Sequence, residues 1–158
     1  MVLVDTSAWI EWLTGSPTGA KLNGQMPEQS DWLVPTMVQL ELAKWLTREL
    51  GEDKADQVIA FTQVCQVIPL DTEIALAAAE ACRAHKLATA DAIIFVTARL
   101  RGATLLTCDA HFEGLPGVTL IGKASAREPS VCSGDRFVDA AHHHRLQFRQ
   151  QLRHHHRV

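Results

Sequence analysis

Residues 87–112 read LATADAIIFVTARLRGATLLTCDAHF, and this stretch indicates the fold class. Its apolar spacing predicts a buried helix that Thr89 caps and that runs to Arg101, followed by the strand TLLTC. Two aspartates, Asp91 and Asp109, interrupt these apolar residues. Because an ionised carboxylate among apolar side chains is costly without compensation, both acids require an explanation.

The same alternation of short aliphatic runs and longer helical patterns extends through residues 1–122. The expected strands are residues 1–5, 32–34, 66–70, 104–108 and 118–121. The expected helices are residues 7–13, 17–26, 36–50, 52–65, 72–86 and 89–101, with Thr6 or Ser7 capping the first and Gly15 ending it. This order predicts a three-layer α/β fold: a mainly parallel sheet of four to five strands with helices on both faces.

The composition is that of a globular protein with one folded domain. The chain has 158 residues, of which 47% are hydrophobic and 21% are charged. No apolar run reaches the roughly 18 residues of a membrane span, and the N-terminus MVLVDTSAW lacks the basic region of a signal peptide. The four cysteines form no C-x-x-C pair, which favours a reduced, cytoplasmic protein over a disulfide framework or a zinc site.

Charge divides the chain into two parts. Residues 1–122 carry 8 Lys/Arg and 15 Asp/Glu, a net charge of −7. Residues 123–158 carry 7 Lys/Arg and 3 Asp/Glu, a net charge of +4, together with six of the eight histidines. We therefore expect a folded domain at 1–122 and a basic, His-rich C-terminal tail at 123–158. A loosely attached appendage is the favoured interpretation of this tail, and an RNA-binding arm is the alternative.

Four acidic residues are predicted to meet at one edge of the sheet. Asp5 ends the first strand, Asp109 follows TLLTC, Asp91 lies in the first turn of its helix, and Glu41 lies in the helix after the second strand. Ligands of α/β proteins bind at this carboxyl edge. Clustered carboxylates repel one another unless a cation neutralises them, and oxygen ligands suit Mg²⁺ or Mn²⁺. Each acid alone also has a structural explanation, as a helix cap, a dipole partner or a turn residue.

Four segments resemble the motifs of PIN-domain ribonucleases, in particular the VapC-type toxins of bacterial toxin–antitoxin pairs: VDTSAWIEWL, ELA around Glu41, LATADAIIFVTA and LLTCDAHF. The resemblance covers residues 1–122 and implies a Rossmann-like sheet, a homodimer, Mg²⁺-dependent endoribonuclease activity and a cognate antitoxin. It makes Asp5, Glu41, Asp91 and Asp109 the metal-site acids, with Asp5 and Asp91 as direct ligands. Thr6, Ser7 and Thr107 match small hydroxyl residues beside that site. His111 is given no catalytic role and is interpreted as a surface histidine.

The resemblance also implies single-stranded or loop RNA as the substrate, and the expected reaction is its metal-assisted cleavage. Two other functions stay open. A haloacid-dehalogenase-like phosphatase also starts with a strand that ends in Asp, but it needs a second Asp where this chain has Ser7. A catalytically weak binding module would act through dimer or antitoxin contacts only, yet all four acids are present.

Two further sets of residues concern the surface. Trp9 is expected in the core, whereas Trp12 and part of the helix around Trp45 are expected to face a second subunit or an antitoxin helix. The basic residues of the helices are interpreted as solvated faces, with a positive rim for RNA as the alternative: Lys44, Arg48, Arg99 and Arg101.

Overall fold

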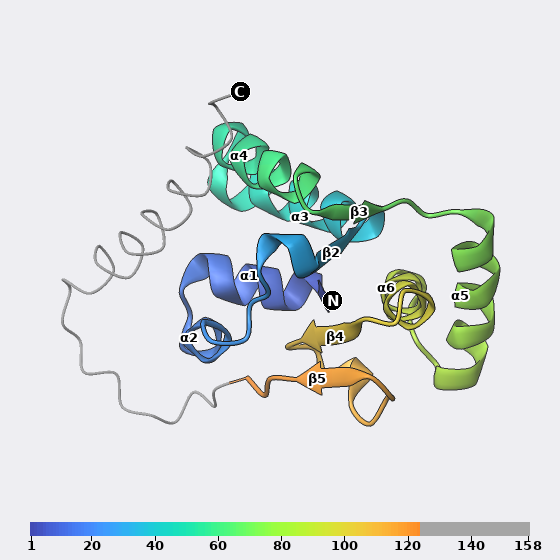
Figure 1. Cartoon of the computed structure of the whole chain (residues 1–158). Helices are drawn as coiled ribbons and strands as arrows, with labels where there is room; N and C mark the ends of the chain where they lie inside the picture. The colour runs from blue at the N-terminus through green and yellow to red at the C-terminus, as the bar shows by residue number, and fades with distance from the viewer. Residues whose placement is uncertain (124–158) are drawn as a thin grey trace. The chain divides into compact units, whose positions relative to one another are not determined.

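Five short parallel strands form the centre of the fold (Figure 1). The computed structural model describes residues 1–123, so the predicted tail lies outside the described residues apart from Lys123. In chain order the strands are β1 (Val2–Val4), β2 (Trp32–Pro35), β3 (Gln66–Ile68), β4 (Thr104–Thr107) and β5 (Val118–Leu120). Their order across the sheet is β3-β2-β1-β4-β5, and all neighbouring pairs are parallel, which confirms the predicted sheet.

The helices cover both faces of this sheet. They are α1 (Thr6–Thr14), α2 (Pro17–Leu22), α3 (Thr36–Leu50), α4 (Glu52–Gln63), α5 (Thr72–His85) and α6 (Thr89–Leu100), with short 3-10 turns η1 (Gln29–Asp31) and η2 (Ala110–Phe112). The chain steps from β1 to β2 to β3 and then returns to the other side of β1. Because parallel crossovers are right-handed, this reversal puts α5 and α6 on the face opposite α1 and α2, as Figure 1 shows. The three-layer prediction is therefore confirmed.

Two predicted helix caps are wrong. Asp5, with an extended backbone, is the N-cap of α1 and accepts a hydrogen bond from the Ser7 amide, so Thr6 and Ser7 already lie inside the helix. Ala88 occupies the N-cap of α6 and makes no side-chain cap, so Thr89 is the first helical residue. Hydroxyl residues favour caps in general, but here the backbone becomes helical one residue earlier.

The core lies between the central strands and the helices. Leu3, Val4 and Val34 on the strands are fully buried, as are Trp9 and Ile94 on the covering helices. The buried position of Trp9 confirms that part of the prediction. No helix within residues 1–123 is long and apolar enough to cross a bilayer.

Trp12 is half-buried and belongs to an aromatic cluster. Its ring lies 6.0 Å from Trp9 and 5.9 Å from Trp32, centroid to centroid, and Trp9 stacks on Trp32 at 4.4 Å. Such ring pairs stabilise beyond their buried area, so Trp12 contributes to internal packing. Its predicted role toward a partner stays a prediction.

Candidate functional site

The carboxyl edge of the sheet holds two of the predicted acids. β1 and β4 are paired with Val4 opposite Leu106, and the Asp5 amide donates to the Leu106 carbonyl at 2.9 Å. Asp5 therefore ends β1 next to the end of β4. Asp109 follows β4 by two residues and starts η2, which places its carboxylate at the same edge.

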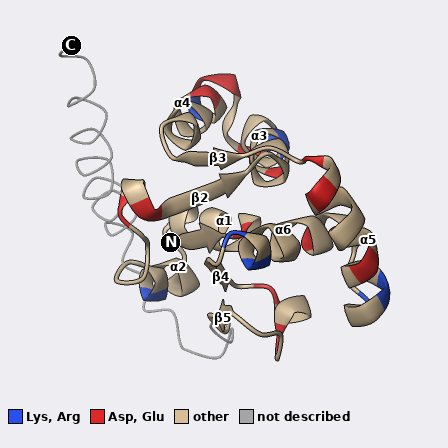
Figure 2. Cartoon of the chain, turned by 45° about the vertical axis from the view of Figure 1, so that its right-hand side comes forward, with Lys and Arg blue, Asp and Glu red and all other residues tan. Residues whose placement is uncertain are grey.

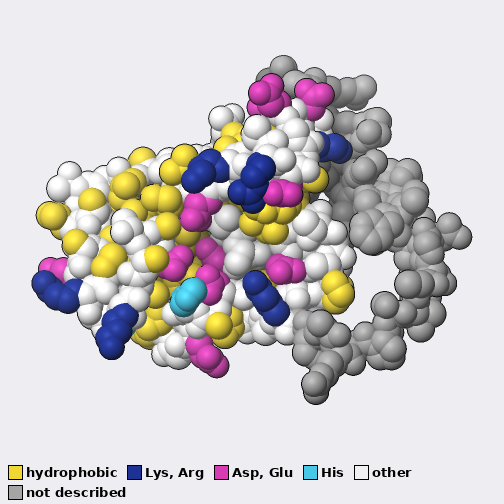
Figure 3. Space-filling model, turned by 180° about the vertical axis from the view of Figure 1, so that it is seen from behind, with side chains coloured by type: hydrophobic (Ala, Val, Ile, Leu, Met, Phe, Trp, Pro, Cys, Tyr) yellow, Lys and Arg dark blue, Asp and Glu magenta, His cyan; other side chains and the backbone are white. Residues whose placement is uncertain are grey.

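The other two acids come from helices that begin at this edge. Asp91 lies in the first turn of α6, and Glu41 lies in the second turn of α3. On the molecular surface, acidic side chains gather near the centre of one face with a histidine among them (Figure 3). The fold thus brings four segments that are distant in sequence to one place.

Hydroxyl groups hold the Asp5 carboxylate. Its Oδ2 accepts hydrogen bonds from the Ser7 hydroxyl at 2.5 Å, the Thr107 hydroxyl at 2.8 Å and the Ser7 amide at 3.2 Å. Asp5 is only 4% exposed, and this burial raises the pKa of its carboxyl although the hydrogen bonds act in the opposite direction. The carboxylate is therefore held in one orientation, while its burial disfavours the ionised form unless a positive charge compensates it.

The same hydroxyls connect the segments of the site. The Ser7 hydroxyl accepts from the Cys108 amide at 3.0 Å, and the Thr107 hydroxyl accepts from the Asp109 amide at 3.0 Å. On the other side, the Thr6 hydroxyl donates to Glu41 Oε2 at 2.5 Å. All three hydroxyl residues that were expected beside the site thus contact its acids or the loop that carries Asp109.

The charges of three acids act on the fourth, Asp91. Burial raises the pKa of Asp91, and the charges of Asp109, Asp5 and Glu41 raise it further, while His111 lowers it. Coulomb interactions of this kind weaken with distance and are strongest in partly desolvated surroundings. The other three carboxylates therefore disfavour the ionised form of Asp91.

His111 is the residue that sequence reasoning left out of this site. Its Nδ1 lies 2.9 Å from Asp109 Oδ1, and its amide donates to the same oxygen at 2.9 Å. One ligand atom each from Asp91, Asp109 and His111 lie within 4.8 Å of one another. The i, i+2 spacing across the 3-10 turn that Asp109 caps was the signal that could have indicated this contact.

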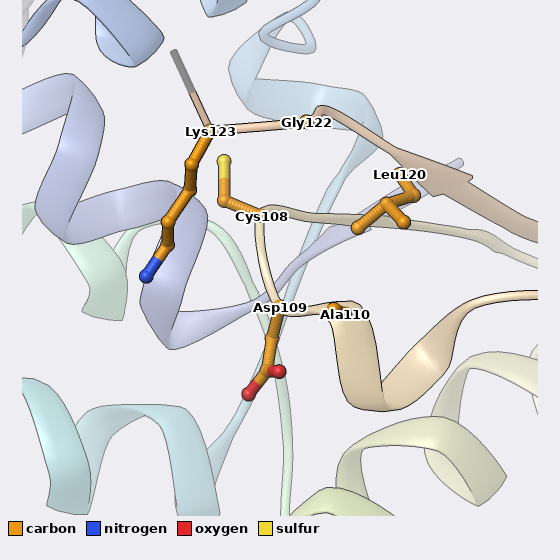
Figure 4. A pocket seen from close by; sticks show the side chains of 6 residues that line it. All are labelled: Cys108, Asp109, Ala110, Leu120, Gly122 and Lys123. Atoms are coloured by element: carbon orange, nitrogen blue, oxygen red, sulfur yellow. The ribbon is translucent and has the colours of Figure 1, made fainter. Parts of the chain in front are cut away.

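A shallow pocket of about 270 Å³ adjoins the acids. It is lined by Cys108, Asp109, Ala110, Leu120, Gly122 and Lys123 (Figure 4). Burial raises the pKa of the Cys108 thiol to about 11, so this thiol is neutral at physiological pH and is a poor nucleophile. The pocket therefore offers one cation, Lys123, beside the carboxylate of Asp109.

Comparison with known proteins identifies this architecture. The sequence model of the PIN domain matches residues 2–118. The chain belongs to the PIN domain family. This PIN domain contains every residue that the sequence resemblance assigned to the site, and the resemblance to that family is confirmed. No curated protein matches the chain.

Several solved structures share the fold of this PIN domain. A toxin–antitoxin complex from Klebsiella pneumoniae aligns with a TM-score of 0.68 and 22% identity over 78% of this chain and 100% of that chain. The sarcin–ricin loop cleaving toxin VapC20 of Mycobacterium tuberculosis aligns with a TM-score of 0.59 and 22% identity over 71% and 92%. DNA-bound VapBC from Salmonella typhimurium aligns with a TM-score of 0.56 and 21% identity over 76% and 97%. At these identities the likeness shows the fold.

The donor groups of the PIN domain fit a divalent metal ion. Asp91 and Asp109 each place a carboxylate oxygen within 4.8 Å of the other and of a His111 nitrogen, and the pKa of Asp91 is raised by burial and by the charges of Asp109, Asp5 and Glu41. Asp5 and Glu41 are not part of this close cluster, and the pKa of Asp5 is raised by burial. A hard dication bound by oxygen ligands removes that repulsion. Ser7, where phosphatase chemistry needs a second acid, instead donates to Asp5, so the phosphatase alternative is dropped.

Proposed function

We propose that this PIN domain is a Mg²⁺- or Mn²⁺-dependent endoribonuclease and the toxin of a toxin–antitoxin pair. The observation that supports it best is the position of Asp91 among other acids, since burial and the charges of Asp109, Asp5 and Glu41 all raise its pKa. A cluster of this kind is stable when a divalent cation occupies it. A toxin with the same fold cleaves the sarcin–ricin loop, which supports the choice of RNA as the substrate.

In this proposal each acid has a defined task. Asp5 and Asp91 hold the metal ion directly, while Glu41 and Asp109 bind a second ion or orient the attacking water. A bound dication activates water, polarises the phosphorus and stabilises the leaving oxygen. Ser7 and Thr107 fix Asp5, and Thr6 fixes Glu41, so that carboxylate geometry is set before the substrate arrives.

An acidic site needs local positive charge to bring a phosphate backbone close. Lys44 and Arg48 lie three and seven residues after Glu41 on α3, which places them on the same helix face. Both are exposed, and Arg48 makes a surface ion pair with Glu49 at 2.6 Å. We propose that the phosphate backbone of RNA binds along Lys44 and Arg48 and at Lys123, which lines the pocket together with Asp109.

Arg99 and Arg101 do not take part in this arrangement. They lie at the C-terminal end of α6, about 12 Å or more along the helix axis from Asp91 in its first turn. Figure 2 shows basic and acidic positions apart from each other along α6. The Arg99 guanidinium lies 5.9 Å from the centre of the Phe95 ring, and Arg101 pairs with Asp71 at 3.8 Å. For these two residues, the interpretation as solvated helix surface is retained.

The proposed partners follow from proteins with this fold. Several are complexes of a toxin with its antitoxin, and some of these are bound to DNA. We therefore propose that a cognate antitoxin restrains this chain, that the chain forms a homodimer, and that it acts in the cytoplasm. The free thiols of Cys65, Cys82 and Cys108 agree with a reducing compartment.

The test is incubation of the purified full-length chain with total RNA in Mg²⁺ or Mn²⁺, with and without EDTA. We expect discrete cleavage products that EDTA abolishes and that restored metal recovers. A chain that binds antitoxin but never cuts RNA would instead be a catalytically weak binding module. Cleavage that persists in EDTA would show that the metal-dependent mechanism is wrong.

A further inference from the structure

The structure places an imidazole where the metal site was expected to contain only oxygen atoms. His111 Nδ1 and Asp109 Oδ1 are 2.9 Å apart. Neighbouring ligands of an octahedral ion with bonds of about 2.1 Å are separated by about 3 Å. The two atoms form an ion pair when His111 is protonated, and their separation is also that of adjacent ligands of a single ion.

A third ligand atom completes one side of this site. Asp91 contributes a carboxylate oxygen, and all three atoms lie within 4.8 Å of one another. Opposite ligands of such an ion are about 4.2 Å apart, so a small side-chain movement brings all three into range. That movement is easy for His111, because its side chain is 77% exposed.

We propose that His111 is a metal ligand in this site and that it makes the site favour Mn²⁺ over Mg²⁺. This inference rests on the proposed metal-dependent function and adds a nitrogen ligand to it. Mg²⁺ takes oxygen ligands almost exclusively, whereas imidazole nitrogen binds divalent transition ions. A ligand set with two carboxylates, from Asp91 and Asp109, and one imidazole, from His111, therefore favours a divalent transition ion over Mg²⁺. Mn²⁺ is such an ion and is similar to Mg²⁺ in size and coordination.

The chain offers a matched control for this idea. His85 is the other histidine within residues 1–123, and it lies in the last turn of α5, where its ring is 5.5 Å from Phe95. Replacing it changes the number of histidines equally and leaves the acidic site intact. The tail histidines stay the same in every variant, so differences between variants report on position 111.

The experiment uses the metal-free full-length chain with one equivalent of Mn²⁺. Electron spin-echo modulation detects ¹⁴N bound directly to Mn²⁺, and competition measures the Mg²⁺ affinity. We expect nitrogen coupling in the wild type and in His85→Ala but not in His111→Ala. We also expect His111→Ala to weaken Mn²⁺ binding about tenfold and Mg²⁺ binding less than about twofold.

Two results would overturn the inference: nitrogen coupling that survives in His111→Ala, or bound Mn²⁺ without nitrogen coupling in the wild type. Asp91→Asn separates this failure from failure of the proposed function. If Asp91→Asn weakens Mn²⁺ binding and the wild-type chain cuts RNA, the nuclease proposal stands whatever the role of His111. If Asp91→Asn leaves Mn²⁺ binding unchanged, the acidic site is not the metal site and both proposals fail.

Discussion

At the scale of single residues, Asp5 combines two opposing properties. Its carboxylate accepts three hydrogen bonds from Ser7 and Thr107, yet its burial raises its pKa. Hydrogen bonds of this kind fix orientation, but they do not supply the positive charge that a buried carboxylate lacks. A bound cation would therefore stabilise the ionised carboxylate of Asp5, and the same reasoning applies to Asp91 among its acidic neighbours.

Exchange of Asp5 or Asp91 for Asn tests this conclusion. The substitution preserves size and removes the charge, so we expect RNA cleavage to fall at least about 100-fold, or roughly 2.7 kcal/mol in the barrier. Circular dichroism should show an unchanged fold. Asp56→Asn, at an exposed position of α4, is the control and should keep full activity. A variant that cuts at the wild-type rate would remove that residue from the metal site.

The raised pKa of Asp91 also predicts how pH affects stability. Burial and the charges of Asp109, Asp5 and Glu41 raise this pKa above its ordinary value of 3.8. The folded state thus binds the proton more tightly than the unfolded state, so ionised Asp91 destabilises the metal-free protein as the pH rises above about 4. In EDTA, we expect Asp91→Asn to have a higher melting temperature than the wild type at pH 7 and no advantage near pH 4. An equal difference at both pH values would contradict the shift.

At the scale of elements, α3 and α6 have different relations to the site. The exposed residues Lys44 and Arg48 lie one and two turns after Glu41, whereas Arg99 and Arg101 lie at the far end of α6 from Asp91. Two double substitutions with the same charge change can therefore be compared. In the Asp91→Asn background, Lys44→Ala with Arg48→Ala should weaken RNA binding and reduce the slope of log affinity against log salt by about 1.4. Arg99→Ala with Arg101→Ala should change the slope little, and equal effects would remove α3 from the RNA path.

A glycine allows α2 to pack against α1. A Cβ atom on Gly19 would lie 2.0 Å from the carbonyl oxygen of Glu11, which is backbone and cannot move without shifting α1. We expect Gly19→Ala to lower the free energy of unfolding by about 1–3 kcal/mol in a denaturant titration. Gly24→Ala, with no atom within 4 Å of its Cβ, is the control and should change stability much less. Equal stability of the two variants would contradict this close contact.

The elements show what the sequence predicts well and where it fails. Central strands were predictable because aliphatic runs bounded by turn residues mark buried parallel strands, and Gly15, with φ 65°, marked the end of α1. The helix caps at Thr6 and Thr89 were wrong because propensity cannot decide between adjacent candidates. The helix expected over 17–26 ends at Leu22, because after one short turn it has no further apolar face to bury.

The site shows the same limit. The placement of Asp5, Asp91 and Asp109 near this edge was predictable, since each lies at the end of a strand or in the first turn of the element that follows at the carboxyl edge of a parallel sheet. Glu41 lies one turn further along α3, and its role in the site stays a prediction. The contact of His111 with Asp109 was not predictable, because it depends on the tight turn of η2, which places residues i and i+2 on the same side. The direction of Lys123 toward the pocket likewise follows from the path after β5 and not from any motif.

At the scale of the whole molecule, the acidic domain and the basic tail have opposite charge. Residues 1–122 have a net charge of −7, which repels RNA at long range, whereas residues 123–158 have a net charge of +4. A tail of that charge raises the encounter rate with RNA at low salt whether or not it touches the site. The effect of residues 123–158 on the encounter rate therefore has to be distinguished from any role of these residues in catalysis.

Truncation after Lys123 makes that separation. Residues 1–123 form a compact unit that contains the five strands, the four acids and the three hydroxyl residues of the site. We expect the shortened chain to fold and, at about 0.15 M salt and saturating RNA, to cut within about threefold of the full-length rate, since screening removes most of the long-range attraction. At low salt and limiting RNA, the cleavage rate of the shortened chain should be lower than that of the full-length chain by a larger factor. A loss of more than about tenfold at saturating RNA, roughly 1.4 kcal/mol, would show that the tail stabilises the transition state itself.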